Sequence, residues 1–333
     1  MVALLRYLAC LLAALVLPAP CGAAPAASPG NVGFQHLQID GTEIGIWYPT
    51  RAAVTPQTLE LLPQAVAVDA PVAGHGLPLV VISHGNGGSY AGHFDTALAL
   101  AQAGFVVAAL THPGDNWHDQ SRATDVAARP RALSGLISYM LDRWPGHATI
   151  DPRRVGAFGF SSGGFTVLAA AGGVPDLHRI AQHCAEHPAF YDCAMMAAHK
   201  DAIVSASAPQ WVADRRIAAL VVAAPALGFT FGRGSLARLT MPIQLWRAAD
   251  DHVLPQPFYA DAVAKDLPTP PDYHIVPGAD HFDFLAPCSA ALATQVPAIC
   301  RSAAGFDRTA FHAQFDTAVV AFFARTLKAG RRQ

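Results

Sequence analysis

Hydrophobic residues recur along the chain in short continuous runs, and a stretch with helical periodicity follows most of them. The runs have no polar alternate face, which predicts strands buried on both sides of a sheet. These strands are expected at 77–85, 105–113, 153–160, 217–225, 241–251 and 272–281. The helical stretches are expected at 94–104, 128–144, 166–173, 257–267 and about 309–328.

This alternation of strand and helix predicts crossover connections and a mainly parallel central sheet with helices on both faces. The expected fold class is therefore α/β. No linker or internal repeat divides the pattern, so residues 27–333 are expected to form a single domain. The segment at about 174–215 breaks the rhythm and is interpreted as a cap-like insertion.

Two other segments precede the alternating region. Residues 31–40 and 42–50 alternate apolar and polar side chains on either side of a glycine-containing turn, which predicts an antiparallel strand pair. The Pro- and Ala-rich stretch at 52–77 shows no sustained period and is expected to be a surface loop.

Residues 1–26 have the pattern of a signal peptide. Arg6 precedes the apolar run "YLACLLAALVL", and small residues offer cleavage points after positions 23 and 26. The run is shorter than the roughly 20 apolar residues of a spanning helix, so cleavage is favoured over a membrane anchor. Lipid attachment at Cys21 fits poorly after Pro20. The mature chain is expected to be exported, either periplasmic or secreted, without a stable membrane span.

Export changes the interpretation of the cysteines. Removal of the signal peptide leaves Cys184, Cys193, Cys288 and Cys300, an even number that predicts disulfides in an oxidising compartment. Pairing of sequence neighbours, Cys184 with Cys193 and Cys288 with Cys300, is favoured. Zinc bound by His183, His187 and the nearby cysteines is the alternative, but neither a CxxC pair nor an HExxH helix is present.

Composition excludes two broad classes of protein. Hydrophobic residues make up 52% of the chain and charged residues 14%, which argues for a sizeable core and against disorder. The formal net charge of -2 gives no indication of a basic patch for nucleic acid, and no nucleic-acid motif is present.

The motif with the clearest chemistry is "GFSSG", at the end of a predicted buried strand. Gly159, Ser161 and Gly163 match G-x-S-x-G, in which a sharp strand-to-helix turn exposes a serine nucleophile. The motif centres on Ser161, because centring it on Ser162 would require glycine in place of Phe160. The backbone N–H of Ser162, at the start of the helix, is then placed to bind an oxyanion.

A second oxyanion donor is expected from "SHGNGG". This loop follows the first long buried strand, where loops of the HG-x-G type supply a backbone N–H. By position, that donor is Asn86. A glycine-rich turn leading into a helix is the structural interpretation of the same residues, and the two interpretations are compatible.

The serine also needs a base and an acid that orients it. Asp250 and Asp251 both end an apolar strand, and the D-x-x-x-P spacing to Pro255 favours Asp251. His281 follows the last strand in a G-x-x-H turn. The resulting order of Ser161, Asp251 and His281 is the order found in α/β-hydrolases.

Other polar and aromatic residues follow the second buried strand in "THPGDNWHDQ". His112 and Trp117 are candidate substrate-binding residues at the expected binding edge of the sheet. A metal cluster here lacks a recognised ligand spacing, and a polar surface loop is favoured. No metal and no organic cofactor is expected.

Taken together, these motifs resemble those of the exported bacterial "predicted dienelactone hydrolase" group of α/β-hydrolases, which is related to platelet-activating-factor acetylhydrolases. The resemblance runs from "IWYPT" at 46–50 to the final helix and includes "SHGNGG", "HPG" at 112–114, "RP" at 129–130, "GFSSGG" and "GADHFDFL". It implies an α/β-hydrolase fold and ester hydrolysis. Dienelactone hydrolases proper use a cysteine nucleophile where this chain has Ser161, so the resemblance does not specify dienelactone as the substrate.

The expected function is that of an exported serine hydrolase acting on small-molecule or lipid esters through a Ser-His-Asp triad and an acyl-enzyme intermediate. Lipase, phospholipase, amidase or thioesterase activity is the alternative within the same chemistry. A non-catalytic ligand-binding protein with a hydrolase fold is the alternative from another class. The sequence carries no signal for the oligomeric state.

Overall fold

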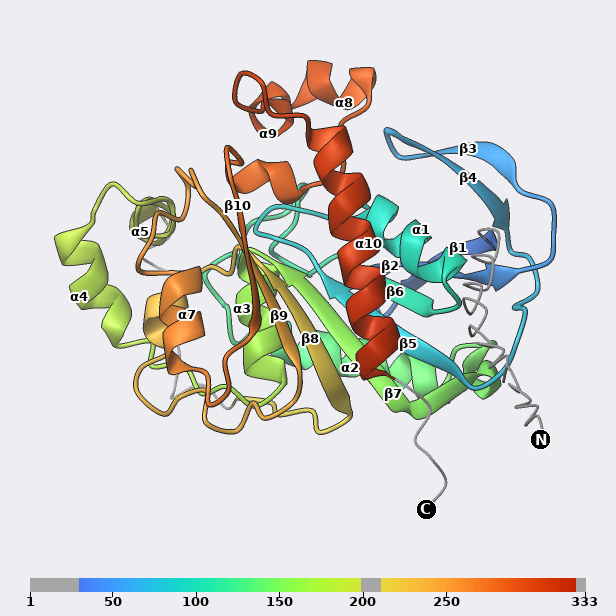
Figure 1. Cartoon of the computed structure of the whole chain (residues 1–333), viewed down its shortest axis with the longest axis horizontal. Coiled ribbons are helices and arrows are strands. Elements are labelled where there is room, and N and C mark those ends of the chain that lie inside the picture. The colour runs from blue at the N-terminus through green and yellow to red at the C-terminus, as the bar shows by residue number, and fades with distance from the viewer. Residues whose placement is uncertain (1–29, 199–210, 328–333) are drawn as a thin grey trace, which may run out of the picture.

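The computed structural model describes residues 30–198 and 211–327, and its strands form a 10-stranded sheet in the order β10-β9-β8-β7-β5-β6-β2-β1-β4-β3 (Figure 1). The parallel part corresponds to the predicted buried runs. Its strands are β5 (Leu77–Ser83), β6 (Val106–Leu110), β7 (Ile150–Phe160), β8 (Ile217–Ala223), β9 (Ile243–Ala248) and β10 (Asp272–Val276).

Both faces of the parallel strands are buried, as their apolar runs predict. In β5, Leu79 and Val81 belong to the core on one face, whereas Val80 and Ile82 belong to the core on the other. The first core includes α2 (Ala128–Asp142), α3 (Ser162–Ala170) and α7 (Ala260–Asp266). The second includes α1 (Phe94–Gln102) and α10 (Arg308–Thr326), which cross the sheet side by side (Figure 1).

The N-terminal strands β1 (Asn31–Ile39) and β2 (Thr42–Thr50) form the predicted antiparallel pair, and β2 joins the sheet beside β6. The prediction of a loop at 52–77 was wrong, because β3 (Thr55–Leu59) and β4 (Leu62–Val68) form a hairpin there. Leu62, Gln64 and Val66 point inward in strict alternation. Gln64 Oε1 accepts a hydrogen bond from Trp47 Nε1 at 2.8 Å, so a polar residue occupies an inward position and obscures the pattern.

The segment interpreted as an insertion follows α3 and precedes β8. It contains α4 (Arg179–Glu186) and α5 (Tyr191–Ala198), which lie beyond one end of the sheet (Figure 1). The Cys184–Cys193 disulfide joins these two helices. Residues 199–210, also within the expected insertion, lie outside the described residues.

Short elements complete the fold: η1 (His147–Thr149), η2 (Gly228–Thr230), η3 (His281–Phe284), α8 (Ala290–Gln295) and α9 (Pro297–Cys300). The Cys288–Cys300 disulfide ties α9 to the segment after η3. The expected signal peptide, residues 1–26, lies outside the described residues. In the part of the chain that the structure describes, every helix is too short or too polar to cross a bilayer.

Candidate active site

Ser161 occupies a strained turn between β7 and α3. Its φ of 55° and ψ of -120° place a non-glycine residue in a region that L-amino acids rarely adopt. Backbone hydrogen bonds hold the turn: the Ser161 N–H donates to Ala223 O at 2.9 Å, and Ser161 O accepts from Ala226 N at 2.9 Å. The turn therefore depends on its contacts with the loop after β8.

The glycines around Ser161 are required by close backbone contacts. A Cβ at Gly159 would lie 2.1 Å from Gly163 O, and a Cβ at Gly163 would lie 1.8 Å from Ser83 O. Neither contact involves a flexible side chain that could move aside. Strand β7, helix α3 and the end of β5 thus approach too closely for any other residue at these positions.

Ser161, His281 and Asp251 lie in a hydrogen-bonded line. His281 Nε2 is 3.0 Å from Ser161 Oγ, and His281 Nδ1 is 2.9 Å from Asp251 Oδ2. The three residues are 8%, 2% and 7% exposed, respectively, so these contacts form in a largely water-free environment. The arrangement can transfer a proton from the serine to the imidazole and stabilise the resulting positive charge.

The two neighbouring aspartates have different environments. Asp251 is buried, and its other oxygen, Oδ1, accepts from the backbone N–H groups of Val253 at 3.0 Å and Leu254 at 2.6 Å. Asp250 is exposed, and its backbone N–H donates to Ala279 O. The turn after β9 therefore directs the Asp251 carboxylate, and not that of Asp250, toward His281.

His281 is held by the capped turn in which it lies. The Asp280 side chain accepts from the His281 N–H at 2.7 Å, and Asp283 Oδ2 accepts from the Asp280 N–H at 2.8 Å. Asp283 is fully buried and pairs with Arg308 of α10, whose Nε is 3.0 Å from Asp283 Oδ1. The ring of Phe160 packs against the imidazole with centroids 4.8 Å apart.

Asn86 lies in the loop after β5 and is held by its side chain. Asp115 Oδ1 accepts from Asn86 Nδ2 at 2.7 Å and from the Gly87 N–H at 3.0 Å. The Tyr191 hydroxyl, from α5, donates to Asn86 Oδ1 at 2.6 Å. Among the described residues, the Asn86 backbone N–H has no hydrogen-bond acceptor, so it is free to bind a ligand.

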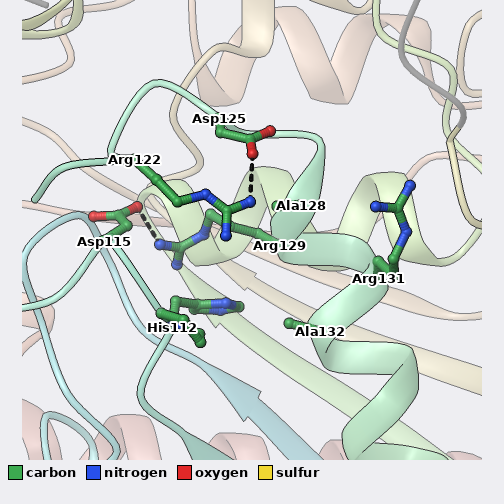
Figure 2. A pocket seen from close by; sticks show the side chains of 9 residues that line it. His112, Asp115, Arg122, Asp125, Ala128, Arg129, Arg131 and Ala132 are labelled. Carbon is green, nitrogen blue, oxygen red and sulfur yellow. Dashed lines mark hydrogen bonds and ion pairs between the residues drawn. The ribbon is translucent and has the colours of Figure 1, made fainter. Parts of the chain in front are cut away.

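The carboxylate of Asp115 is itself anchored by Arg129, at the start of α2. Figure 2 shows the Arg129 guanidinium directed at Asp115, with His112 below it. Arg129 also donates to the His84 carbonyl, which precedes the Asn86 loop. Burial lowers the pKa of Arg129, and Asp115 opposes that effect. Sequence motifs drew attention to "RP", but they did not indicate this contact.

His112 and Trp117 occupy different environments. His112 is buried, and its Nε2 lies 2.8 Å from the hydroxyl of Ser83, the last residue of β5. Burial lowers the pKa of His112 well below its ordinary value, so the ring is neutral. Trp117 is 57% exposed, and its backbone N–H donates to Gly88 O at 3.3 Å. Of these two candidate substrate-binding residues, only Trp117 therefore presents its side chain to solvent near the Asn86 loop.

The insertion packs a buried acid and a histidine against aromatic residues from later in the chain. Asp192 Oδ1 accepts from the Tyr259 hydroxyl at 3.0 Å, and burial raises the pKa of Asp192. The His183 ring stacks on Phe229 with centroids 3.7 Å apart. Because Cys184 and Cys193 are joined in a disulfide, their sulfurs are not available as thiolate ligands for zinc.

Comparison with known proteins supports the fold. The structure of a ferulic acid esterase from Streptomyces cinnamoneus superposes with a TM-score of 0.60 over 93% of this chain and 96% of that chain, at 18% sequence identity. The chain has the α/β-hydrolase fold.

Sequence comparison matches a smaller part of the chain. A protein named "Putative esterase NocK", from Nocardia uniformis subsp. tsuyamanensis, is 34% identical over 110 residues. The match covers 32% of this chain and 32% of that protein, about a third of its length. No family model matches the chain.

Proposed function

We propose that the protein is an exported serine hydrolase that cleaves carboxylic esters through an acyl-enzyme intermediate. The observation that carries the proposal is the hydrogen-bonded line from Ser161 through His281 to Asp251. Its position at the carboxyl end of a parallel sheet is where ligands bind in open α/β folds. The similarity to two proteins named as esterases favours esters as the substrate class.

The proposed reaction has two halves. His281 takes the proton from Ser161 Oγ as that oxygen attacks the ester carbonyl, and Asp251 stabilises the imidazolium. The alcohol leaves with the proton from His281, and the acyl group remains on Ser161. Water then gives a proton to His281 and attacks the acyl carbon. As the acid leaves, His281 returns that proton to Ser161 Oγ, which restores the serine.

The negative charge of each tetrahedral intermediate would be stabilised by the backbone N–H groups of Asn86 and Ser162. Ser162 is the first residue of α3, so its N–H has no acceptor within the helix. The N–H of Asn86 has no acceptor among the described residues. Losing one donor of this kind typically lowers kcat by about 10²–10³-fold.

We further propose that the chain belongs to the "predicted dienelactone hydrolase" group and is exported. The motifs "SHGNGG", "GFSSGG" and "GADHFDFL" support the group, and they contribute Asn86, Ser161 and His281, respectively. The two disulfides support export, because disulfides persist in oxidising compartments.

The direct test expresses residues 27–333 in an oxidising compartment and assays 4-nitrophenyl esters from acetate to palmitate. We expect hydrolysis by the wild type, near-complete loss in Ser161→Ala and substantial retention in Ser162→Ala, which keeps its backbone N–H. A folded wild type that is inert on the whole series would overturn the proposal. If the protein acts only at lipid interfaces or on amides or thioesters, the proposed triad stands and the proposed substrate class is wrong.

A further inference from the structure

Arg129 makes contacts on both sides of the proposed oxyanion site. On one side, it donates to Asp115 and to the His84 carbonyl, which together hold the loop that contains Asn86. On the other side, its Nε donates to Thr166 Oγ1 at 3.0 Å. The Thr166 hydroxyl in turn donates to the Ser162 carbonyl at 2.7 Å. One guanidinium therefore connects the segments that carry the two proposed donors.

We propose that Arg129 is a positioning residue that fixes the Asn86 and Ser162 N–H groups relative to each other. The inference rests on the proposed function, because it assigns those N–H groups to the oxyanion. Arg129 itself does not touch the reacting atoms. Its planar guanidinium has donors in fixed directions, whereas lysine has a single ammonium on a flexible chain and cannot reproduce them.

The contacts of Arg129 are built into the protein interior. Arg129 and Asp115 side chains are each 3% exposed, and Thr166 is fully buried. A buried ion pair is not an efficient way to gain stability, because hydrophobic residues of similar volume often do as well. Positioning explains the Arg129–Asp115 pair better than stability does, because a small displacement of catalytic donors can reduce the rate by about 100-fold.

A cavity beside Arg129 provides access for an external probe. It has a volume of about 300 Å³ and is lined by His112, Asp115, Arg122, Asp125, Arg129 and Arg131, among others (Figure 2). Asp115 already lines this cavity, and truncation of Arg129 would enlarge the cavity by the space that the guanidinium occupies. A free guanidinium ion could then enter and restore the hydrogen bonds to Asp115 and the His84 carbonyl.

The test compares Arg129→Ala and Arg129→Lys with Arg131→Ala, an exposed arginine of the same helix that makes no ion pair among the described residues. We expect kcat on the best ester to fall by about 10- to 100-fold in both Arg129 variants, with KM changed little. Binding of an alkyl boronic acid, whose serine adduct is tetrahedral, should weaken in proportion to kcat/KM. Arg131→Ala should match the wild type.

Two further measurements separate positioning from general loosening of the site. Guanidinium chloride should raise the activity of Arg129→Ala and sodium chloride at the same concentration should not. The midpoint of the acid limb of the kcat/KM–pH profile should stay at the wild-type value, because His281 is held by other residues. Folded Arg129 variants with wild-type kcat and boronic acid affinity would overturn the inference.

A variant that keeps the ion pair covers the case in which Arg129 substitutions do not fold. Thr166→Val removes both the acceptor of Arg129 Nε and the hydrogen bond to the Ser162 carbonyl, while Arg129 keeps its pair with Asp115. It should lower kcat and boronic acid affinity together. Unchanged kcat and boronic acid affinity in folded Thr166→Val would contradict the proposed connection from Arg129 to Ser162. If the wild type itself hydrolyses no ester and binds no boronic acid, the proposed function fails. If the wild type is active and the Arg129 variants have the same kcat and boronic acid affinity, only the inference about Arg129 fails.

Discussion

The Tyr191 hydroxyl lies 2.6 Å from Asn86 Oδ1 and donates a hydrogen bond to it, which links helix α5 to the loop after β5. Tyr191 is 44% exposed, so its ring borders solvent while its hydroxyl is engaged. The contact makes the insertion part of the surroundings of the proposed oxyanion donor. Together with Asp115, it fixes both ends of the Asn86 amide.

Removing only this hydroxyl should affect catalysis more than stability. For Tyr191→Phe we expect kcat/KM to fall by a few-fold, because Asn86 retains its bond to Asp115, and the thermal midpoint to change little. Tyr139→Phe, on α2, is the control and should leave both quantities unchanged. If steady-state kinetics give Tyr191→Phe the same kcat/KM as the wild type, the contact between the insertion and Asn86 does not influence catalysis.

Two glycine substitutions should have opposite effects on folding. Gly163→Ala places a Cβ 1.8 Å from Ser83 O, so we expect loss of the folded state or displacement of the Ser161 turn. Gly135→Ala, on α2, meets nothing within 4 Å and should stabilise the protein by up to about 1 kcal/mol through helix propensity. Urea unfolding measures the stability of each variant, and ester hydrolysis measures its activity. A folded and fully active Gly163→Ala would contradict the described turn.

Arg308 should contribute far more to stability than another arginine of the same helix. Its pair with Asp283 is buried, so Arg308→Ala leaves a charge uncompensated and should lower the free energy of unfolding by about 3–5 kcal/mol. Arg325 pairs with Asp272 at the surface, and Arg325→Ala should cost about 0–1 kcal/mol. Equal losses in chemical unfolding would show that the Asp283 pair is not desolvated.

Asp316 should make the protein less stable as the pH rises. Burial, with Asp95 nearby, raises the pKa of Asp316 to about 7. A carboxyl whose pKa is higher in the folded state binds more protons there, so stability declines between about pH 4 and pH 7 and then levels off. Asp316→Asn should therefore gain stability over the wild type at pH 8, on the order of 1–3 kcal/mol.

That gain should be almost absent at pH 4, where the wild-type carboxyl is protonated in the folded state and about half protonated in the unfolded state. Unfolding curves at the two pH values provide the comparison. Asp125→Asn is the control, because Asp125 is at the surface in a pair with Arg122. A gain of the same size at pH 4 and pH 8 would mean that Asp316 is not responsible for the pH dependence.

Local patterns were sufficient to predict much of this molecule. Continuous apolar runs indicate the buried strands, and the spacing of Gly159, Ser161 and Gly163 indicates the sharp turn between β7 and α3. The hairpin at β3 and β4 was missed because Gln64 occupies an inward position and bonds Trp47. An inward glutamine looks like a break in periodicity unless its distant partner is known.

Long-range polar contacts were also beyond prediction from the sequence. Arg129 and Asp115 are separated by 14 positions, and Tyr191 and Asn86 by 105. Nothing local to either pair indicates the partner, since each contact joins the first turn of a helix to a loop that follows a strand of the sheet. The "RP" resemblance singled out Arg129 without indicating what it binds.

The most direct test of the account is the identity of the acylated residue. The protein is mixed with a 4-nitrophenyl ester, quenched in acid within the first turnovers and digested for peptide mass spectrometry. We expect an acyl group on Ser161 in the wild type and none in Ser161→Ala. Acylation of Ser162 or of another residue, with turnover retained in Ser161→Ala, would contradict this expectation.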